Sequence, residues 1–378
     1  MDATPLVDWA PLARLLLLAA TIALVPLAWL WLRQRGSDTR GRLAALTALT
    51  MFLTFDLVVF GSFTRLTDSG LGCPDWPGCY GEVSPFGARD AIHAAQSATP
   101  GGPVTWSKAW IEMIHRYLAM TVGALILVMA VVSWTQRKRL PFSPWWPTLT
   151  LVWVVVQGLF GKYTVTLKLY PLIVTLHLLG GLLLLALLAA QHATFSGRGL
   201  VLGRALRRGA WVVLALLGVQ IALGGWVSSN YAVLACTGFP QCNGAWWPAM
   251  DFGHGFTLLR GLGEGRDGSG LTFEALVAVH MAHRLFALAA ITALLWLAWR
   301  LWRQPEGALR RQGAGLAALT GLQFASGLSN VVLGWPLVAA LGHSAGAAGM
   351  VLLLTLLLAR SAPGRVAGAT PRPLATAA

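Results

Sequence analysis

Residues 61–81 read GSFTRLTDSGLGCPDWPGCYG, and residues 225–244 read GWVSSNYAVLACTGFPQCNG. Each segment carries a pair of cysteines that encloses five residues, Cys73 with Cys79 and Cys236 with Cys242, and the chain of 378 residues has no other cysteine. The first cysteines of the two pairs are 163 positions apart. Two matched segments at this distance indicate that one structural unit occurs twice, and such a repeat determines the fold.

Three further landmarks recur in the same order after each cysteine pair. The segments EMIHRYLA (Glu112–Ala119) and HMAHRLFA (His280–Ala287) each contain a His-Arg pair. A glutamine and a glycine follow, then a proline and a histidine, and the glutamine precedes that histidine by 20 residues in both copies. These residues are Gln157, Gly161, Pro171 and His177 in the first copy and Gln323, Gly327, Pro336 and His343 in the second. The chain is therefore predicted to be an internal duplication.

The composition predicts a protein of the lipid bilayer. The chain is 56% hydrophobic and 11% charged, with a mean hydropathy of +0.65, whereas a soluble domain is about a quarter charged. Apolar stretches of about 20 residues, the length that crosses hydrocarbon as a helix, occur at 11–33, 43–63, 112–134, 146–167, 171–194, 210–229, 276–302, 314–335 and 339–360. The first is too long for a cleavable signal and is expected to remain as a span.

These spans predict an all-α polytopic membrane protein of two tandem four-helix bundles, with one extra N-terminal transmembrane helix. Because an even number of spans separates the copies, they run in the same direction, as in parallel-repeat membrane folds. We expect an extra helix with a basic loop (1–42), an N-terminal half (43–197), a basic linker (198–209), a C-terminal half (210–360) and a tail (361–378).

The formal charge of +14 is explained by topology. Eighteen of the 28 basic residues follow the odd-numbered spans, the asymmetry that marks the cytoplasmic face: Arg33, Arg35, Arg40, Arg42, Arg137, Lys138, Arg139, Arg198, Arg204, Arg207, Arg208, Arg300, Arg303, Arg310, Arg311, Arg360, Arg365 and Arg372. Most acidic residues fall in the opposite loops. We therefore predict an outer N-terminus and a cytoplasmic C-terminus in a bacterial inner membrane, and no binding of nucleic acid.

That orientation places both cysteine pairs on the outer side of the membrane. An oxidising compartment favours local disulfides, Cys73 with Cys79 and Cys236 with Cys242. The alternatives are inert thiols or a metal site, but neither loop contains a histidine and neither pair has CxxC spacing, so zinc is disfavoured.

Four histidines are predicted to share one depth in the membrane. His115, His177, His283 and His343 each lie within about one or two turns of the outer end of an inward-running span, or about 5–10 Å below the surface. An ionisable side chain there is costly unless it is paired or acts as a ligand. Two imidazoles per bundle suit bis-axial ligation of heme iron better than zinc. The alternative is a neutral histidine bonded to a backbone carbonyl.

Residues beside these histidines carry the finer predictions. Arg116 and Arg284 follow their histidines directly, so each is expected either to pair with heme propionates or to reach the interface. Glu112 precedes His115 by three residues and shares its helix face, whereas His280 takes that place before His283. A carboxylate beside one site alone suggests proton exchange there and chemistry in the first half, although a first-turn acid is also favoured by the helix dipole.

Taken together, these segments resemble the heme A synthase family. The matching pieces are FGSFTRLTDSGLGCPDWPGCYG, EMIHR, TLHLLGG around His177, CTGFPQC, HMAHR and LGHSAGA around His343. The resemblance covers about residues 43–360. The first span and the long loop 64–111 depart from the smallest family members.

The resemblance implies a reaction and its ligands. His283 and His343 would be axial ligands of a resident heme b, with Arg116 and Arg284 as cofactor-binding residues. His115 and His177 would bind the substrate, heme O, beside Glu112. The C8 methyl group of heme O would become the formyl group of heme A through two successive hydroxylations and loss of water. The implied partners are heme O synthase (a protoheme farnesyltransferase) and cytochrome c oxidase or its assembly factors, and a homo-oligomer stays open.

Two other function classes fit part of the pattern. A diheme cytochrome b-like electron carrier would keep both hemes permanently and would have no use for Glu112. A thiol oxidoreductase would use the cysteine loops, but their five-residue spacing argues against it. A role for Cys73 and Cys79 in turnover stays open beside their structural one.

Overall fold

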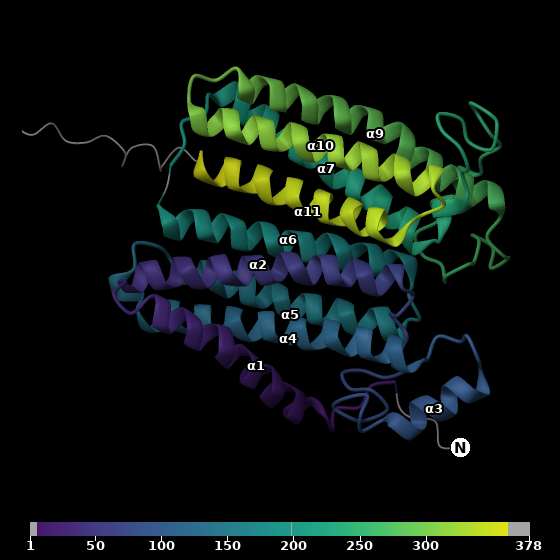
Figure 1. Cartoon of the computed structure of the whole chain (residues 1–378), viewed down its shortest axis with the longest axis horizontal. Helices are drawn as coiled ribbons and strands as arrows, with labels where there is room; N and C mark the ends of the chain where they lie inside the picture. The colour runs from purple at the N-terminus through teal and green to yellow at the C-terminus, as the bar shows by residue number, and fades with distance from the viewer. Residues whose placement is uncertain (1–5, 198, 362–378) are drawn as a thin grey trace, which may run out of the picture.

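The computed structural model describes residues 6–197 and 199–361, and within them all the regular structure is helical. This described part of the chain contains nine long helices, two short ones and two short 3₁₀ segments, and Figure 1 shows how the long helices are arranged. Their bounds are α1 Leu12–Arg33, α2 Thr39–Leu66, α3 Arg89–Ala98, α4 Trp106–Thr135, α5 Trp145–Thr166, α6 Pro171–Ser196, α7 Arg204–Ser229, α8 Phe252–Gly255, α9 Phe273–Trp302, α10 Gly307–Val332 and α11 Leu337–Arg360.

The long helices lie side by side, with their connections gathered at two ends (Figure 1). We name the end that holds both cysteine loops the loop end, and the opposite end, where the arginine-rich connections lie, the basic end. Eight of the described helices are long and apolar enough to cross a membrane, which confirms the prediction of a polytopic helical membrane protein. Arg198, Arg365 and Arg372, together with nearly all of the predicted tail, lie outside the described residues.

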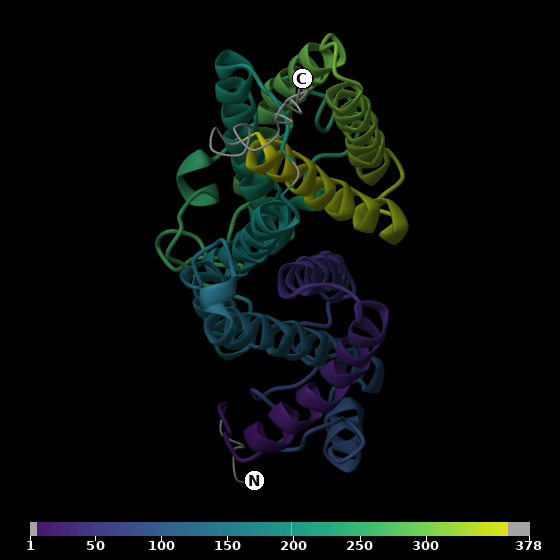
Figure 2. The same ribbon diagram turned by 90° about the vertical axis from the view of Figure 1, so that its left-hand side faces the viewer.

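Two groups of four helices form the body of the protein. In the first half, α2 contacts α4 and α6, and α5 lies against the same two helices. In the second half, α7 contacts α9 and α11, and α10 lies against that pair. The halves meet through α6 against α11, α2 against α11, and α6 against α7 (Figure 2). The extra helix α1 packs outside the first half, mainly on α4.

Matching local signals begin the corresponding helices of the two halves. Thr105 caps α4 by accepting a hydrogen bond from the Lys108 amide at 3.3 Å, and Thr272 caps α9 through the Ala275 amide at the same distance. A threonine in this position satisfies one of the free amide groups of a first helical turn. The duplication read from the sequence therefore extends to the helix starts.

The eighth predicted span, 314–335, departs from the expectation. It falls in α10, which is packed in the second half but is not among the eight described helices that are apolar enough to cross a membrane. Five glycines and several polar residues lower its hydropathy. Its place depends on close packing instead, because a β-carbon at Gly313 would lie 2.6 Å from the Ala298 carbonyl oxygen of α9.

At the loop end, two helices extend beyond their predicted spans. α4 begins six residues before its predicted span, and α9 begins three residues before. His115 therefore lies nine residues after the start of its helix, about two and a half turns. The loop 64–111 contains the helix α3, which packs on α4 and was not expected.

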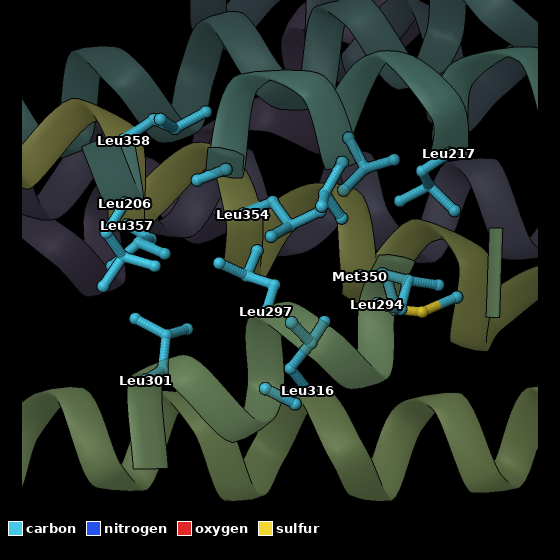
Figure 3. Close-up of a cluster of buried hydrophobic side chains, with 14 of the residues drawn as sticks. Leu206, Leu217, Leu294, Leu297, Leu301, Leu316, Met350, Leu354, Leu357 and Leu358 are labelled. Carbon is cyan, nitrogen blue, oxygen red and sulfur yellow. The ribbon is translucent and has the colours of Figure 1, made fainter. Parts of the chain in front are cut away.

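Apolar side chains fill the basic-end half of both bundles. In the second half, leucines of α7, α9, α10 and α11 interlock around Leu297, Leu301 and Leu354, each fully buried (Figure 3). In the first half, Leu125, Ile126 and other residues of α2, α4 and α6 form the equivalent cluster. The predicted histidines lie beyond these clusters, toward the loop end. Each bundle is thus packed with apolar side chains at the basic end and carries the predicted histidines toward the loop end.

The α9–α10 contact can be tested with two glycines of α10. Gly313→Ala places a methyl group against the α9 backbone and should destabilise the protein by about 1–3 kcal/mol, as overpacking does. Gly321→Ala is the matched control, because a β-carbon there meets nothing within 4 Å. Thermal unfolding in detergent should show a lower midpoint for Gly313→Ala alone, and equal midpoints would contradict this account of α10.

Candidate functional site

Each of the four predicted histidines lies against a glycine of the neighbouring helix. A β-carbon at Gly61 would be 2.9 Å from Cε1 of His115, and one at Gly224 would be 3.0 Å from Cε1 of His283. The corresponding distances are 3.6 Å for Gly161 to His177 and 3.1 Å for Gly327 to His343. In every case the glycine leaves room for the ring on a facing helix. This contact joins the first helix of each half to the second, and the third to the fourth.

The four rings form two pairs, one in each half. His115 and His177 come from α4 and α6 of the first half, and His283 and His343 come from α9 and α11 of the second. Phe60 lies parallel to the His115 ring, with the ring centroids 6.3 Å apart. The structure thus brings the predicted residues together pairwise, as bundles do when they hold a ligand between facing side chains.

A glutamine lies in each bundle, buried in the first half and partly buried in the second. A β-carbon at Gly180 would lie 2.0 Å from Nε2 of Gln157, and one at Gly346 would lie 2.5 Å from Oε1 of Gln323. These glycines of α6 and α11 therefore accommodate side chains of their own halves. The glutamine that recurs in the sequence thus packs against a glycine of the histidine-bearing helix in each bundle.

The two cysteine pairs form the predicted disulfides, Cys73–Cys79 and Cys236–Cys242. Both bridges are buried, the first beside Met113 of α4 and the second beside Met281 of α9. Each loop then closes with the same tight turn, in which Cys79 pairs with Glu82 and Cys242 with Ala245 through two backbone hydrogen bonds.

These turns explain the residues that follow each second cysteine. Tyr80 and Asn243 have φ of 52° and 53°, and Gly81 and Gly244 have φ of 74° and 80°. Two residues with positive φ in succession define the hairpin turn that favours glycine in its second position. In the first loop, Asp75 also accepts hydrogen bonds from the Tyr80 and Gly81 amides. Burial and the negative charge of Asp75 raise the pKa of Tyr80.

The arginine after each helical histidine holds the disulfide loop. Arg116 donates to the carbonyl oxygens of Asp75 at 3.0 Å, Pro77 at 3.2 Å and Gly78. Arg284 donates to the carbonyl oxygens of Gln241 and Cys236, both at 3.2 Å. Sequence reasoning missed this role because it depends on the folded loops. A guanidinium group suits it, since five donors in a fixed plane can bind several carbonyls at once.

Glu112 joins the first loop to the helix of His115. The side chain is 4% exposed, and its Oε2 accepts a hydrogen bond from the Cys73 amide at 2.8 Å. Its Oε1 lies 2.5 Å from Nη2 of Arg116 in a buried ion pair. In the second half, His280 takes this place, and its Nδ1 lies 3.0 Å from the Ala232 carbonyl oxygen. The predicted asymmetry between the halves is therefore present, and Glu112 contacts the loop directly.

A second asymmetry was not expected from the sequence. The Nδ1 atoms of His115 and His177 are buried and have no hydrogen-bond partner among the described residues. In the second half, Nδ1 of His343 lies 3.0 Å from the Ser326 hydroxyl, and Nδ1 of His283 lies 3.1 Å from Nε2 of Gln220. Gln220 was visible as a polar residue in an apolar span, but neither residue recurs in the first half.

The site chemistry fits a planar metal cofactor in each half. Each bundle offers two imidazole rings as possible metal ligands. The described residues contain no group of three or more His, Cys, Asp or Glu that would hold a bare metal ion. Two imidazoles in each bundle, each beside a glycine, suit two axial ligands of heme iron. The fold and site thus define an integral membrane protein with a duplicated pair of partly buried histidines.

Comparison with known proteins identifies the family. The model of the family described as "Cytochrome oxidase assembly protein" matches residues 44–357, and the chain belongs to this family. A heme A synthase of Shewanella oneidensis is 38% identical over 84% of this chain and 95% of its own length. A heme A synthase of Rhizorhabdus wittichii is 28% identical over 82% and 90%. One of Shouchella clausii is 29% identical over 55% and 65%.

The contact between Glu112 and the first loop predicts how its disulfide reacts. Glu112→Leu removes the acceptor of the Cys73 amide and the partner of Arg116. Hydrogen bonds to charged groups contribute about 1.5–3 kcal/mol, so local opening should rise on the order of tenfold or more. Cys73–Cys79 should then be reduced faster by a phosphine, as measured by maleimide labelling and peptide mass analysis.

The second disulfide is the internal control for this measurement. Cys236–Cys242 lies in the other half and has no contact with Glu112 among the described residues. Its reduction rate should stay at the wild-type value in the same sample. A parallel increase at both bridges would indicate general unfolding and would contradict a local role for Glu112.

Proposed function

We propose that this chain is a heme A synthase, a membrane oxidoreductase that converts the C8 methyl group of heme O to the formyl group of heme A. The observation that carries the proposal is the duplicated histidine pair, with each ring against a glycine of a facing helix. The family membership and the curated relatives named heme A synthase support the same activity. Two successive hydroxylations of the methyl carbon, followed by loss of water, account for the oxidation level of the product.

The second half is proposed to hold the resident heme b. His283 and His343 would be its axial ligands, and both have a polar group within hydrogen-bond distance of Nδ1. A second hydrogen bond of this kind fixes the orientation of a metal-binding imidazole. The resident cofactor supplies a one-electron redox centre when bound. In this half, Arg284 holds the disulfide loop in place through its hydrogen bonds to the loop carbonyls. The Nε atom of Arg284 has no hydrogen-bond partner within the described residues.

The first half is proposed to be the substrate site, with His115 and His177 as ligands of heme O. Glu112 has no counterpart in the second half, where His280 takes its position. Through the Cys73 amide and Arg116, its carboxylate links the disulfide loop to the helix that carries His115. We assign Glu112 two tasks, exchange of protons at this site and positioning of the loop above the substrate. Arg116 is proposed to serve the same site through the loop and through propionate binding.

The remaining proposals concern placement and partners. The functional halves correspond to residues 43–197 and 210–360, joined by the linker 198–209. The basic end is proposed to face the cytoplasm and the loop end the outer side of a bacterial inner membrane, which accords with an oxidising environment for the disulfides. Heme O synthase would supply the substrate, and cytochrome c oxidase or its assembly factors would receive the product.

Substitution of the second-half ligands should remove the resident cofactor. His283→Ala or His343→Ala leaves one axial ligand, so the purified protein should lose most of its heme b absorbance. Pyridine hemochrome spectra and mass analysis of the extracted hemes measure this loss. Equal loss of heme b from His115→Ala would contradict the division between the halves.

Substitution in the first half should affect turnover instead. His115→Ala and Glu112→Gln should retain heme b and lower the conversion of heme O by about 10²-fold or more, the contribution expected of a positioned acid or base. Conversion is followed by chromatography of hemes from membranes supplied with heme O.

The same assay separates the proposal from an electron carrier with two permanent hemes. Heme A or a hydroxylated intermediate should accumulate with the wild-type protein. Unchanged heme O, with two hemes per chain in the purified protein, would instead favour the electron carrier.

A further inference from the structure

The His343 ring is held by a hydroxyl group that acts as an acceptor. Oγ of Ser326 donates to the Leu322 carbonyl oxygen at 2.7 Å and lies 3.0 Å from Nδ1 of His343. A serine hydroxyl has a single proton, and here the Leu322 carbonyl receives it. The contact with the ring is then a hydrogen bond from Nδ1–H to Oγ. Nε2 of His343 keeps a free lone pair, the state that a metal ligand requires.

His283 has an equivalent neighbour on α7. The side-chain nitrogen of Gln220 lies 3.1 Å from Nδ1 and 3.4 Å from Nε2 of His283 and donates to the His283 carbonyl oxygen at 3.2 Å, while Oε1 of Gln220 is buried without a partner among the described residues. The nitrogen and oxygen of an amide can exchange places by rotation. Ligation of iron by Nε2 requires a proton on Nδ1 of His283, and Gln220 accepts that proton only after its amide rotates and gives up the bond to the His283 carbonyl oxygen. Ser326 is thus an acceptor for His343 as it stands, and Gln220 becomes one for His283 on rotation of its amide.

The first half lacks both of these polar side chains. The repeat places Phe160 at the position of Ser326 and Leu57 at the position of Gln220, in register with the glycines that contact the rings. Neither side chain can accept a hydrogen bond. Accordingly, Nδ1 of His177 and of His115 is buried without a partner in the described part of the chain. The two histidine pairs therefore have the same ligand residues, but only the second pair has polar side chains near its Nδ1 atoms.

We propose that Ser326 and Gln220 are positioning residues that make the second-half site a permanent one, and that Phe160 and Leu57 keep the first-half site exchangeable. This inference rests on the proposed function. An acceptor at Nδ1 makes the imidazole a stronger donor to iron and fixes the plane of the ring. It therefore stabilises the oxidised heme and slows its release. Rings without an acceptor bind less strongly, as a site that must admit a substrate and release a product requires.

The test uses the purified, heme-loaded full chain and two substitutions that copy the first half or remove the acceptor. Ser326→Ala and Gln220→Leu should raise the midpoint potential of the resident heme and change its low-spin electron paramagnetic resonance signal. Transfer of heme b to added apomyoglobin should become about tenfold faster or more, the usual effect of losing such a partner. Ser326→Thr, which keeps the hydroxyl, should behave as the wild type.

Thr320→Val is the matched control for the loss of a hydroxyl. Thr320 is a buried residue of the same helix, and its Oγ1 donates to the Leu316 carbonyl oxygen at 2.8 Å. This variant should leave the potential, the resonance signal and the transfer rate unchanged. A folded Ser326→Ala protein that purifies without heme b also supports the inference if Thr320→Val retains it.

The outcomes separate this inference from the proposed function. Wild-type values of potential, resonance signal and transfer rate in both Ser326→Ala and Gln220→Leu would overturn the inference, while heme bound through His283 and His343 would leave the proposed function standing. A wild-type protein without heme b in the second half would overturn both.

Discussion

The structure depends on the contact between an imidazole ring and a glycine on the facing helix. A histidine within a membrane helix is costly unless its nitrogens have partners, and a ring can reach the bundle interior only where the opposite backbone leaves room. The four glycines provide that room at matched positions. They also set the spacing of the helices at the loop end, while leucines and methionines set it at the basic end. The polar end of each bundle is thus as closely defined as its apolar core.

Most of the fold could be predicted because membrane helices and repeats leave strong signals in a sequence. Continuous apolar runs marked eight of the spans, and the only four cysteines marked the register of the duplication. α10 was harder, since its place depends on Gly313 packing against α9 rather than on hydropathy. The early start of α4 was missed because its first turns, from Trp106, include polar residues that an apolar window excludes.

The candidate site was predictable where the halves agree and not where they differ. His115, His177, His283 and His343 recur in order, so the repeat itself indicated them. Ser326 and Gln220 carry no such signal, because their counterparts are Phe160 and Leu57. Nor could the carbonyl contacts of Arg116 and Arg284 be read from the chain, since they exist only once the loops have closed. Residues whose role depends on contacts formed in the folded chain could be recognised only from the structure.

The interface between the halves has a symmetry of its own. α2 meets α11 as α7 meets α6, and α6 meets α11 across the centre. Because α2 corresponds to α7 and α6 to α11, the same surface of each half faces the other, as in an isologous dimer with a two-fold axis. Two separate copies of one four-helix protein would associate in this way. In a homodimer both subunits have the same sequence. When the two copies are joined in one chain, a substitution can affect one half without affecting the other.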